Sequence, residues 1–267
     1  MTTAYARAMT FSTTESGVRR GVIDDSWHQG RGAFGGLLAA MTLRAMMEDV
    51  SDPERLPRSL TVHFCGPASG PFDLVSELVR AGSRVTHATA RITTEKGVST
   101  FASASFCKDR PDGASYALAT MPDVKPASEL RDVPRDLPGI AAFFQHVEAR
   151  FAGPTFPFSS SPASGARVAA WVRLRDPVVI DAPVAALLLD SLPPAITATF
   201  GVPRAVASVD FTVQFFTKLT ARDLDSDHYL VSITSRWAGD GYTEELRDLW
   251  SPRGELLAQC RQLIALL

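Results

Sequence analysis

The feature of this sequence that most limits its possible folds is an internal repeat of one apolar helix combined with several strands. The first unit contains a predicted helix at Phe34–Met47, and the second contains one at Pro183–Leu192. Leu74-Val75-Ser76 in the first unit recurs as Leu230-Val231-Ser232 in the second, about 156 residues later. A chain that repeats such a unit is predicted to form two similar α+β units, each with a sheet wrapped around a buried helix.

Strand patterns account for most of the remaining residues in both units. Runs rich in β-branched and aromatic residues, separated by Gly and Pro turns, predict antiparallel strands. In the first unit these are Arg58–Phe64, Phe72–Arg80, Val85–Thr94 and Ser99–Cys107. In the second unit they are Val168–Leu174, Ser208–Phe216, Tyr229–Arg236, Tyr242–Trp250 and Leu256–Leu263. Two sheets of this kind can pair edge to edge, which removes two exposed sheet edges.

A long connection separates the two units. Asp109–Gly139 is rich in Pro and Asp, and Ile140–Phe151 has apolar residues at helical spacing, so a linker with a short helix is predicted. A connection of roughly 55 residues is longer than a compact domain usually has. We therefore predict an N-terminal unit at residues 1–108, a linker at 109–166 and a C-terminal unit at 167–267.

Composition narrows the class of protein. The 267 residues are 45% hydrophobic, which suits one large domain or two small ones, and the net charge of −2 gives no basic field to attract nucleic acid. No apolar run is long enough for a membrane span, and Met1–Phe11 lacks the apolar core of a secretory signal. The three cysteines, Cys65, Cys107 and Cys260, are far apart, which indicates reduced thiols in a cytoplasmic protein.

Several familiar motifs are absent or lack their structural context. Gly30–Gly35 matches G-x-G-x-x-G, but the residues before it, Asp24–Gln29, do not form the buried strand that a dinucleotide site requires. We expect a flexible loop leading into a helix instead. There is no G-x-S-x-G nucleophile motif, and His63 and His87 lie in strand patterns without metal-ligand spacing. No metal or other cofactor is expected.

Three polar residues stand in unusual surroundings. Asp190 follows the run Ala185–Leu189, where its neighbours at helical spacing are apolar, and desolvation of a carboxylate raises its pKa and its basicity. Gln262 is the one amide on a strand face that is otherwise apolar. Ser208 opens a strand on which we expect it to share a face with Asp210, Thr212 and Gln214. Each residue also has an ordinary interpretation as a surface carboxylate, a strand-edge hydroxyl or an amide at a chain end.

Comparison of the two units favours a functional interpretation. The first helix starts with Gly35-Gly36 and has no carboxylate until Glu48, whereas the second helix has Asp190 and no Gly pair at its start. Ser105 is predicted to stand where Gln262 stands in the repeat. One site could therefore combine a base from the second helix with unpaired backbone N–H groups from the start of the first, which suit a developing oxyanion.

Four segments resemble the acyl-CoA thioesterase II (TesB-type) family, and the resemblance covers nearly the whole chain. Ala33–Gly36 is similar to the family's V-F-G-G motif, and Leu189–Leu192 is similar to its second-helix segment with the catalytic Asp. Ala207–Thr212 is similar to its A-T-I-D-H-S strand, and Gly254–Gln262 is similar to its last strand. The resemblance implies a double hotdog fold. It also implies that Asp190, Ser208 and Gln262 orient and activate a water molecule.

The same resemblance implies hydrolysis of fatty or other acyl-CoA to the free acid and CoA without a cofactor. Backbone N–H groups of Gly35 and Gly36 are candidates for binding the oxyanion. A cytoplasmic protein of fatty acid metabolism is expected, which forms a homodimer or a higher homo-oligomer, with acyl-CoA as partner and neither nucleic acid nor membrane. Departures from the family pattern, which concern acyl specificity and efficiency, stand at Leu37, Phe211 and Gln214.

Two other functions fit the same fold. A hotdog enoyl-CoA hydratase or dehydratase would need a histidine that faces the carboxylate across the acyl tunnel, and His63 and His87 are the candidates. A non-catalytic acyl-CoA-binding protein is the other alternative, although the retained Asp, Ser and Gln argue against it.

Overall fold

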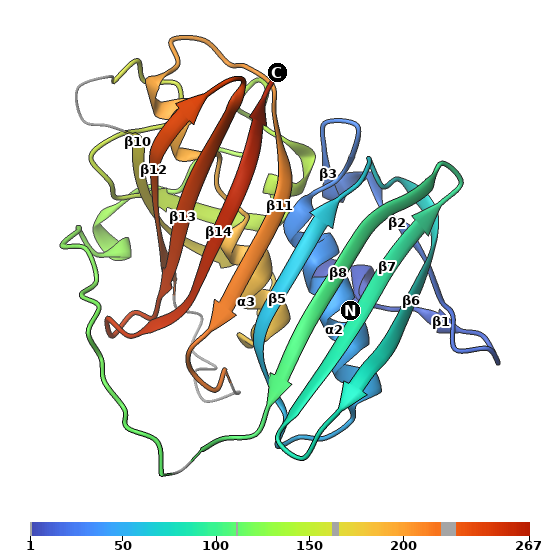
Figure 1. The fold of residues 1–267 in the computed structure, drawn as a ribbon. Coiled ribbons are helices and arrows are strands. Elements are labelled where there is room, and N and C mark those ends of the chain that lie inside the picture. Colours follow the sequence, from blue (N-terminus) through green and yellow to red (C-terminus); the bar gives the residue numbers. More distant parts are fainter. Residues whose placement is uncertain (1, 111, 162–165, 220–227) are drawn as a thin grey trace.

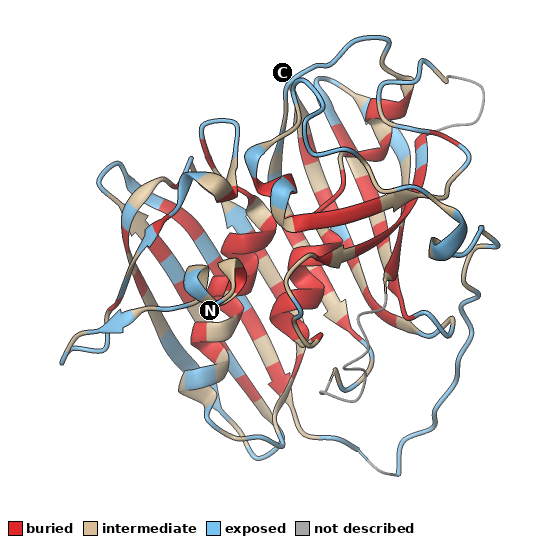
Figure 2. Ribbon diagram, turned by 180° about the vertical axis from the view of Figure 1, so that it is seen from behind, coloured by how far each residue is buried: buried red, intermediate tan, exposed pale blue. Residues whose placement is uncertain are grey.

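The structure, a computed structural model, describes residues 2–110, 112–161, 166–219 and 228–267. In this part of the chain twelve strands form one antiparallel sheet, and the two longer helices lie together against one face of it (Figures 1 and 2). The strands of this sheet are β1 Ser12–Thr13, β2 Arg19–Ile23, β5 Leu56–Phe64, β6 Gly70–Ala81, β7 Val85–Thr94, β8 Gly97–Cys107, β9 Val147–Phe151, β10 Ala166–Leu174, β11 Val206–Phe215, β12 Tyr229–Gly239, β13 Tyr242–Trp250 and β14 Leu256–Leu266.

The order of the strands shows how the two repeated units join. The sheet runs β1-β2-β6-β7-β8-β5-β11-β14-β13-β12-β10-β9. From the centre outwards, the first unit contributes β5, β8, β7, β6 and β2, and the second contributes β11, β14, β13, β12 and β10 in the corresponding places. β5 and β11 pair antiparallel at that centre, with Val62 opposite Phe211 (Figure 1). The predicted edge-to-edge pairing of two sheets is therefore confirmed, and it leaves neither unit with an open inner edge.

The two buried helices form where their capping residues and composition predict. α2 (Gly35–Val50) is rich in Ala, Leu and Met and ends at Ser51, which adopts a left-handed conformation. α3 (Ala182–Leu189) begins at Asp181, whose side chain accepts a hydrogen bond from the Val184 N–H, and has a proline in its first turn. Among the described residues, no helix has the length and apolar character that crossing a membrane requires.

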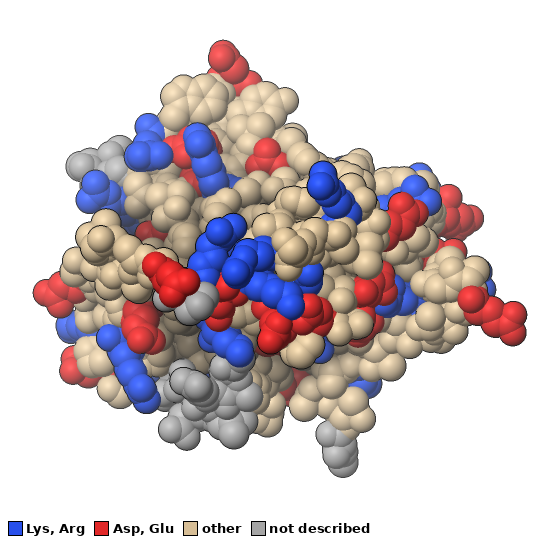
Figure 3. Space-filling model, turned by 60° about the horizontal axis from the view of Figure 1, so that its bottom comes forward, with Lys and Arg blue, Asp and Glu red and all other residues tan. Residues whose placement is uncertain are grey.

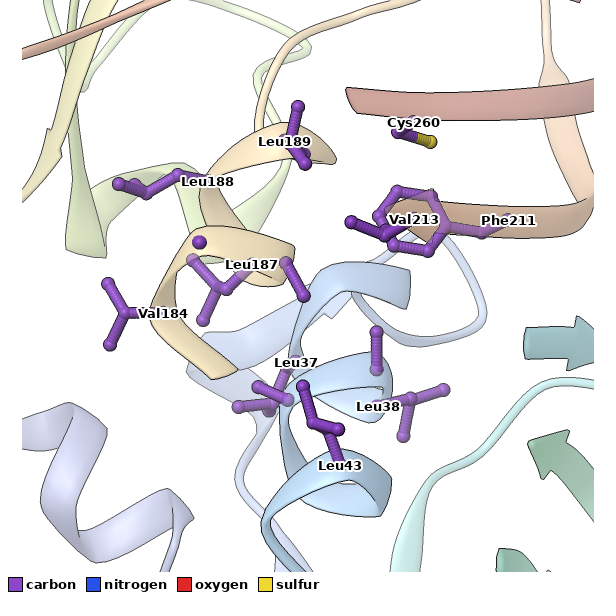
Figure 4. Packing of buried hydrophobic residues seen from close by; sticks show 14 of the residues in the cluster. Leu37, Leu38, Leu43, Val184, Leu187, Leu188, Leu189, Phe211, Val213 and Cys260 are labelled. Atoms are coloured by element: carbon purple, nitrogen blue, oxygen red, sulfur yellow. The ribbon is translucent and has the colours of Figure 1, made fainter. Parts of the chain in front are cut away.

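The main core lies between these helices and the sheet. Leu37 and Leu43 from α2 pack beside Leu187 from α3, and Phe211 and Val213 face them from the sheet (Figure 4). Full burial of each such side chain contributes about 1.5–3 kcal/mol. One continuous cluster thus joins the two units, so the contact between α2 and α3 belongs to the core itself.

The short helix predicted within Ile140–Phe151 is present only in part. Its residues form a short 3-10 helix, η3 (Ala142–His146), followed directly by β9, which pairs with β10 at the edge of the sheet. The Phe143 ring stacks on Phe34 with 4.0 Å between centroids. Strand pairing and ring stacking, both long-range contacts, thus override the helical spacing. β9 also means that the sheet takes a strand from residues predicted to be linker.

The N-terminal segment contains short elements that were not predicted. These are α1 Ala4–Ala8, η1 Asp25–Trp27 and the hairpin of β3 His28–Gln29 and β4 Gly32–Ala33, besides the edge strands β1 and β2. The hairpin occupies the G-x-G-x-x-G segment. A Cβ at Gly32 would lie 2.8 Å from the backbone nitrogen of Ala68, so this glycine permits close approach of two backbone segments.

Candidate functional site

The structure brings Asp190, Gln262 and Ser208 together in one chain of hydrogen bonds. The Gln262 amide Nε2 donates to Asp190 Oδ1 at 3.1 Å, and Ser208 Oγ donates to Gln262 Oε1 at 2.9 Å. The amide therefore has a fixed orientation, with its nitrogen toward the carboxylate and its oxygen toward the hydroxyl. Gln262 is 1% exposed and the Asp190 side chain 7% exposed, so the ordinary surface interpretations of both residues are wrong.

Asp190 lies at the C-terminal cap of α3, one residue past the helix, and not within it as predicted. Burial raises the pKa of its carboxyl group to about 6. The Arg247 guanidinium, the Gln262 amide and the Gly36 N–H each favour the ionised form and limit this rise. A helix C-terminus is the negative end of the helix dipole, which also disfavours a carboxylate. The position yields a carboxyl group whose pKa lies closer to neutral pH than that of an ordinary aspartate.

Ser208 reaches the inner face of the sheet because of a β-bulge. The register places Ser208 opposite Ile264 but Asp210 opposite Leu263, so Val209 is the extra residue. Asp210 Oδ1 accepts a hydrogen bond from the Leu263 N–H at 3.0 Å, which ties the bulge to β14. The prediction that Ser208 shares a face with Asp210, Thr212 and Gln214 is therefore wrong, since strict alternation fails at the bulge.

The same register identifies the true counterpart of Gln262 in the first unit. β5 carries an equivalent bulge between Pro57 and Ser59. Leu60, the second paired residue after this bulge, pairs with Ala104. At the equivalent place after the β11 bulge, Phe211 pairs with Gln262. Ala104 and not Ser105 thus corresponds to Gln262, and the predicted equivalence was wrong by one residue. Ser105 lies on the outer face, where its hydroxyl bonds His87.

The start of α2 lies directly against the Asp190 carboxylate. A Cβ at Gly35 would lie 2.8 Å from Asp190 Oδ2, and one at Gly36 would lie 2.8 Å from the carbonyl oxygen of Leu187. The two glycines therefore allow the helix start to approach the end of α3. The N-cap residue Phe34 makes no side-chain capping bond, and the Gly36 N–H donates to the Asp190 carboxylate instead.

Two charged residues beside the site were missed in the sequence. Glu245 and Arg247 lie on the inner face of β13 and are 0% and 1% exposed. Arg247 Nη1 lies 3.8 Å from Asp190 Oδ1. The sequence holds one signal for them, because Glu245 and Arg247 share a face of β13 with Thr243 and Leu249. The alternation alone does not show that this face is the buried one.

The histidines considered for a hydratase face away from this site. His63 and His87 are both exposed on the outer face of the sheet. His63 stacks on Phe101 with 6.4 Å between ring centroids, and His87 Nδ1 lies 3.0 Å from Ser105 Oγ. Neither can face Asp190 across a shared tunnel, since the sheet lies between them.

The departures from the family pattern have different environments. Leu37 and Phe211 are fully buried in the core between the helices and the sheet. Gln214 is partly buried in the centre of the sheet, opposite Gln259 on one side and Ser59 on the other. Two of the three departures are thus changes of core packing.

A basic surface lies at the opposite end of the central strands. Figure 3 shows Lys and Arg side chains gathered on this face, with Asp and Glu among them. A pocket of about 490 Å³ is lined by Pro53, Glu54, Leu56, Arg84, Lys108, Asp109 and Lys218. It includes the Leu56 end of β5, whereas Phe64 at the other end of β5 approaches Gly35. The pocket is therefore separate from the site around Asp190.

Comparison with protein families assigns both halves of the chain. The sequence profile named acyl-CoA thioesterase C-terminal domain matches residues 118–266, and the profile named acyl-CoA thioesterase N-terminal domain matches residues 23–107. The first match begins within the predicted linker. No curated protein is similar enough to the chain to count as a match.

Solved structures resemble the whole molecule. A protein of unknown function with a hotdog fold from Alicyclobacillus acidocaldarius is 27% identical, with 100% of this chain and 99% of that chain covered and a TM-score of 0.89. The acyl-CoA thioesterase II TesB2 from Mycobacterium marinum is 21% identical, with 99% and 98% covered and a TM-score of 0.77. A tesB protein from Mycobacterium avium subs paratuberculosis is 18% identical, with 98% of each chain covered and a TM-score of 0.78. The predicted α+β double hotdog fold is confirmed.

Proposed function

The chain belongs to the acyl-CoA thioesterase family, as the sequence resemblance predicted, and we propose that it hydrolyses acyl-CoA thioesters to the free acid and CoA. The observation that carries this proposal is the buried hydrogen-bonded chain from Asp190 through Gln262 to Ser208. A carboxylate with a pKa near 6 beside an oriented amide and hydroxyl is suited to activating water at neutral pH.

In the proposed reaction, Asp190 acts as a general base. Its carboxylate takes one proton from a water molecule while the water oxygen forms a bond to the thioester carbonyl carbon. Gln262 and Ser208 position that water through hydrogen bonds. The tetrahedral intermediate then breaks its carbon–sulfur bond, and the CoA thiolate leaves with the electron pair. The proton on Asp190 passes to the thiolate or to solvent, which restores the base.

The start of α2 supplies the complementary half of the site. A negative charge develops on the carbonyl oxygen in the transition state, and unpaired backbone N–H groups at a helix start stabilise such a charge. Gly35 and Gly36 lie within contact of Asp190, so an oxygen bound there would be close to the activated water. Because Gly36 already donates toward the Asp190 carboxylate, substrate binding must share or redirect this donor.

The alternatives receive less support from the same geometry. A hydratase would need an acid or base facing Asp190, and His63 and His87 lie on the outer face of the sheet. A non-catalytic binding protein has no need of an ionisable group that is buried, raised in pKa and connected to an amide and a hydroxyl. Such an arrangement lowers stability without improving packing.

The decisive measurement is thiol release from a panel of acyl-CoAs with short, medium and long chains, combined with an enoyl-CoA hydration assay. We expect thiol release with at least one chain length and no loss of the enoyl chromophore. Hydration without thiol release would establish the hydratase alternative. Binding of acyl-CoA with neither reaction would establish the non-catalytic one. Hydroxylamine should trap no acyl-enzyme, since water and not a side chain attacks the substrate.

A further inference from the structure

Glu245 and Arg247 form a buried ion pair on the inner face of β13. Arg247 Nε donates to Glu245 Oε1 at 2.6 Å, and a second guanidinium nitrogen, Nη2, contacts the same oxygen. Both side chains are almost completely excluded from solvent. Since burying two charges costs free energy even when they are paired, such a pair calls for an explanation other than stability.

The pair makes specific contacts with the segment that carries Asp190. Arg247 Nη1 donates to the carbonyl oxygen of Leu189 at 2.8 Å and lies 3.8 Å from Asp190 Oδ1. Glu245 Oε2 accepts a hydrogen bond from the Ala195 N–H at 2.9 Å. Residues immediately before and shortly after Asp190 are therefore both fixed to β13.

The first unit shows that the fold itself does not require this pair. Glu245 lies opposite Gln262, and Arg247 lies opposite Cys260. In the other half, Ala88 lies opposite Ala104, which corresponds to Gln262, and Ala90 lies opposite Ala102. Two small apolar residues thus occupy the equivalent positions in a unit with the same strand order. The charges are present only where the carboxylate is present.

We propose that Glu245 and Arg247 are positioning residues that hold the Asp190 carboxylate against Gln262 and set its charge. This inference rests on the proposed function, in which Asp190 is the base. Arg247 favours the ionised carboxylate, and Glu245 both orients Arg247 and partly offsets its charge. The pair therefore fixes the geometry of the base and adjusts its basicity at the same time.

The groups that face Asp190 define the expected signs. Arg247 and Glu245 face it from β13, the Cys260 thiol and the Gln262 amide from β14, and the Gly36 N–H from α2. Burial raises the pKa of Cys260 well above its ordinary value, so the thiol stays neutral and adds no charge. Asp210 lies on β11 near Cys260. Glu245→Gln leaves the Arg247 charge unopposed, whereas Arg247→Met leaves two carboxylates without a cation.

The test measures the ionisation of Asp190 directly in the full-length protein. Carboxyl carbons of ¹³C-labelled aspartate are titrated by NMR, and the Asp190 signal is identified by its loss in Asp190→Asn. Glu245→Gln should move the Asp190 midpoint to lower pH, and Arg247→Met should move it to higher pH, each by about one pH unit or more. Arg247→Lys retains the charge but not the fork geometry, so it should keep the midpoint near the wild-type value while kcat falls.

Glu244→Gln is the matched control, since Glu244 lies next to Glu245 on the opposite face of β13 and should change neither quantity. The acid limb of kcat/KM should move with the NMR midpoint in each variant. Equal midpoints in Glu245→Gln, Arg247→Met and wild type, with folding intact by circular dichroism, would overturn the inference. If Arg247→Met fails to fold, Glu245→Gln and Arg247→Lys still decide it. Absence of thioesterase activity with opposite midpoint shifts would reject the proposed function and leave the charge-setting role of the pair in place.

Discussion

On the inner face of the C-terminal half, β14 carries Gln262 and β13 carries Arg247, whereas the same register positions in the N-terminal half carry Ala104 and Ala90. The remaining polar positions differ in the same way. Asp190 and the fully buried Leu43 lie at the same sequence distance from the N-caps of α3 and α2, so they correspond to each other. Ser208, the last paired residue before the β11 bulge, corresponds to Pro57 before the β5 bulge. At each of these positions the N-terminal unit carries an apolar residue where the C-terminal unit carries a polar one.

The helix starts show the opposite asymmetry. The start of α3 is capped by Asp181, which also pairs with Arg44 at 2.6 Å. The N-cap residue of α2 provides no side-chain cap, Gly35 lies against Asp190, and the Gly36 N–H donates to the Asp190 carboxylate. Of the two sites that a symmetric pair would form, one thus has a buried carboxylate and a helix start without an N-cap side chain, and the other has neither. Two half-sites from different units make one complete site.

The largest effect that separates the two halves should come from the carboxylate. Asp190→Asn removes the base while retaining the shape of the side chain, so kcat should fall by roughly 10² to 10⁴. The matched change in the other half, Leu43→Met, conserves volume and should leave kcat unchanged. Steady-state thiol release with both variants tests this. An unchanged kcat in Asp190→Asn would remove Asp190 from the mechanism.

The same substitution should reveal the cost of ionising this carboxyl group in the folded protein. Its pKa is raised from 3.8 to about 6 by burial, a difference worth about 3 kcal/mol. Because the folded state binds this proton more tightly, wild-type stability should fall as pH rises from about 4 to about 6 and then stay level with respect to this group. Asp190→Asn cannot ionise and should be more stable than wild type above pH 6.

Urea unfolding of both proteins between pH 4 and pH 8 measures that difference. The stability gained by Asp190→Asn should be smallest near pH 4 and should grow up to about pH 6. A difference that is constant over the whole range would show that the pKa of Asp190 is the same in the folded and unfolded states.

The amide should have the next largest effect. Gln262→Leu keeps a similar volume but removes a hydrogen bond to a charged group worth about 1.5–3 kcal/mol, so kcat should fall roughly 10- to 150-fold. Ala104→Ser, at the equivalent register position, should leave kcat unchanged, since Leu43 offers no carboxylate there. Loss of activity in Ala104→Ser equal to that in Gln262→Leu would mean that both halves contribute to one pathway.

The sequence was sufficient to predict the parts of this comparison that depend on local pattern. α2, α3 and the nine strands β5 to β8 and β10 to β14 follow from hydrophobic periodicity and turn residues, with ends within a few residues of those observed. The positions of Asp190 and Gln262 on buried faces were predicted for the same reason.

The sequence failed where long-range pairing decides the outcome. β9 is a strand because β10 offers an edge, although its own spacing is helical. Ser208 faces inward because a bulge, tied by Asp210 to β14, breaks strict alternation. The Glu245–Arg247 pair was not recognised, since charged residues that alternate on a strand usually face solvent and only the register shows that these face α3.

The bulge itself should have a smaller effect on activity. Asp210→Ala removes the carboxylate that accepts from the Leu263 N–H, so Ser208 should be held less firmly toward Gln262, and kcat should fall about tenfold with KM little changed. Ser59→Ala, at the corresponding position after the other bulge, is the control and should leave kcat unchanged. An Asp210→Ala variant that folds with wild-type kcat would separate the bulge from catalysis.

The smallest effect should come from the cap of α3. Asp181→Ala removes a side-chain hydrogen bond to the Val184 N–H and an ion pair that is about one-third exposed, so the free energy of unfolding should fall by about 1 kcal/mol. It also uncaps the helix start that belongs to the site without a base. kcat should therefore stay at the wild-type value, and Asp181→Ala combined with Asp190→Asn should be no more active than Asp190→Asn alone. Activity restored in that double variant would show that free N–H donors are sufficient for hydrolysis, and the asymmetry of the carboxylates would then not explain why one half is active.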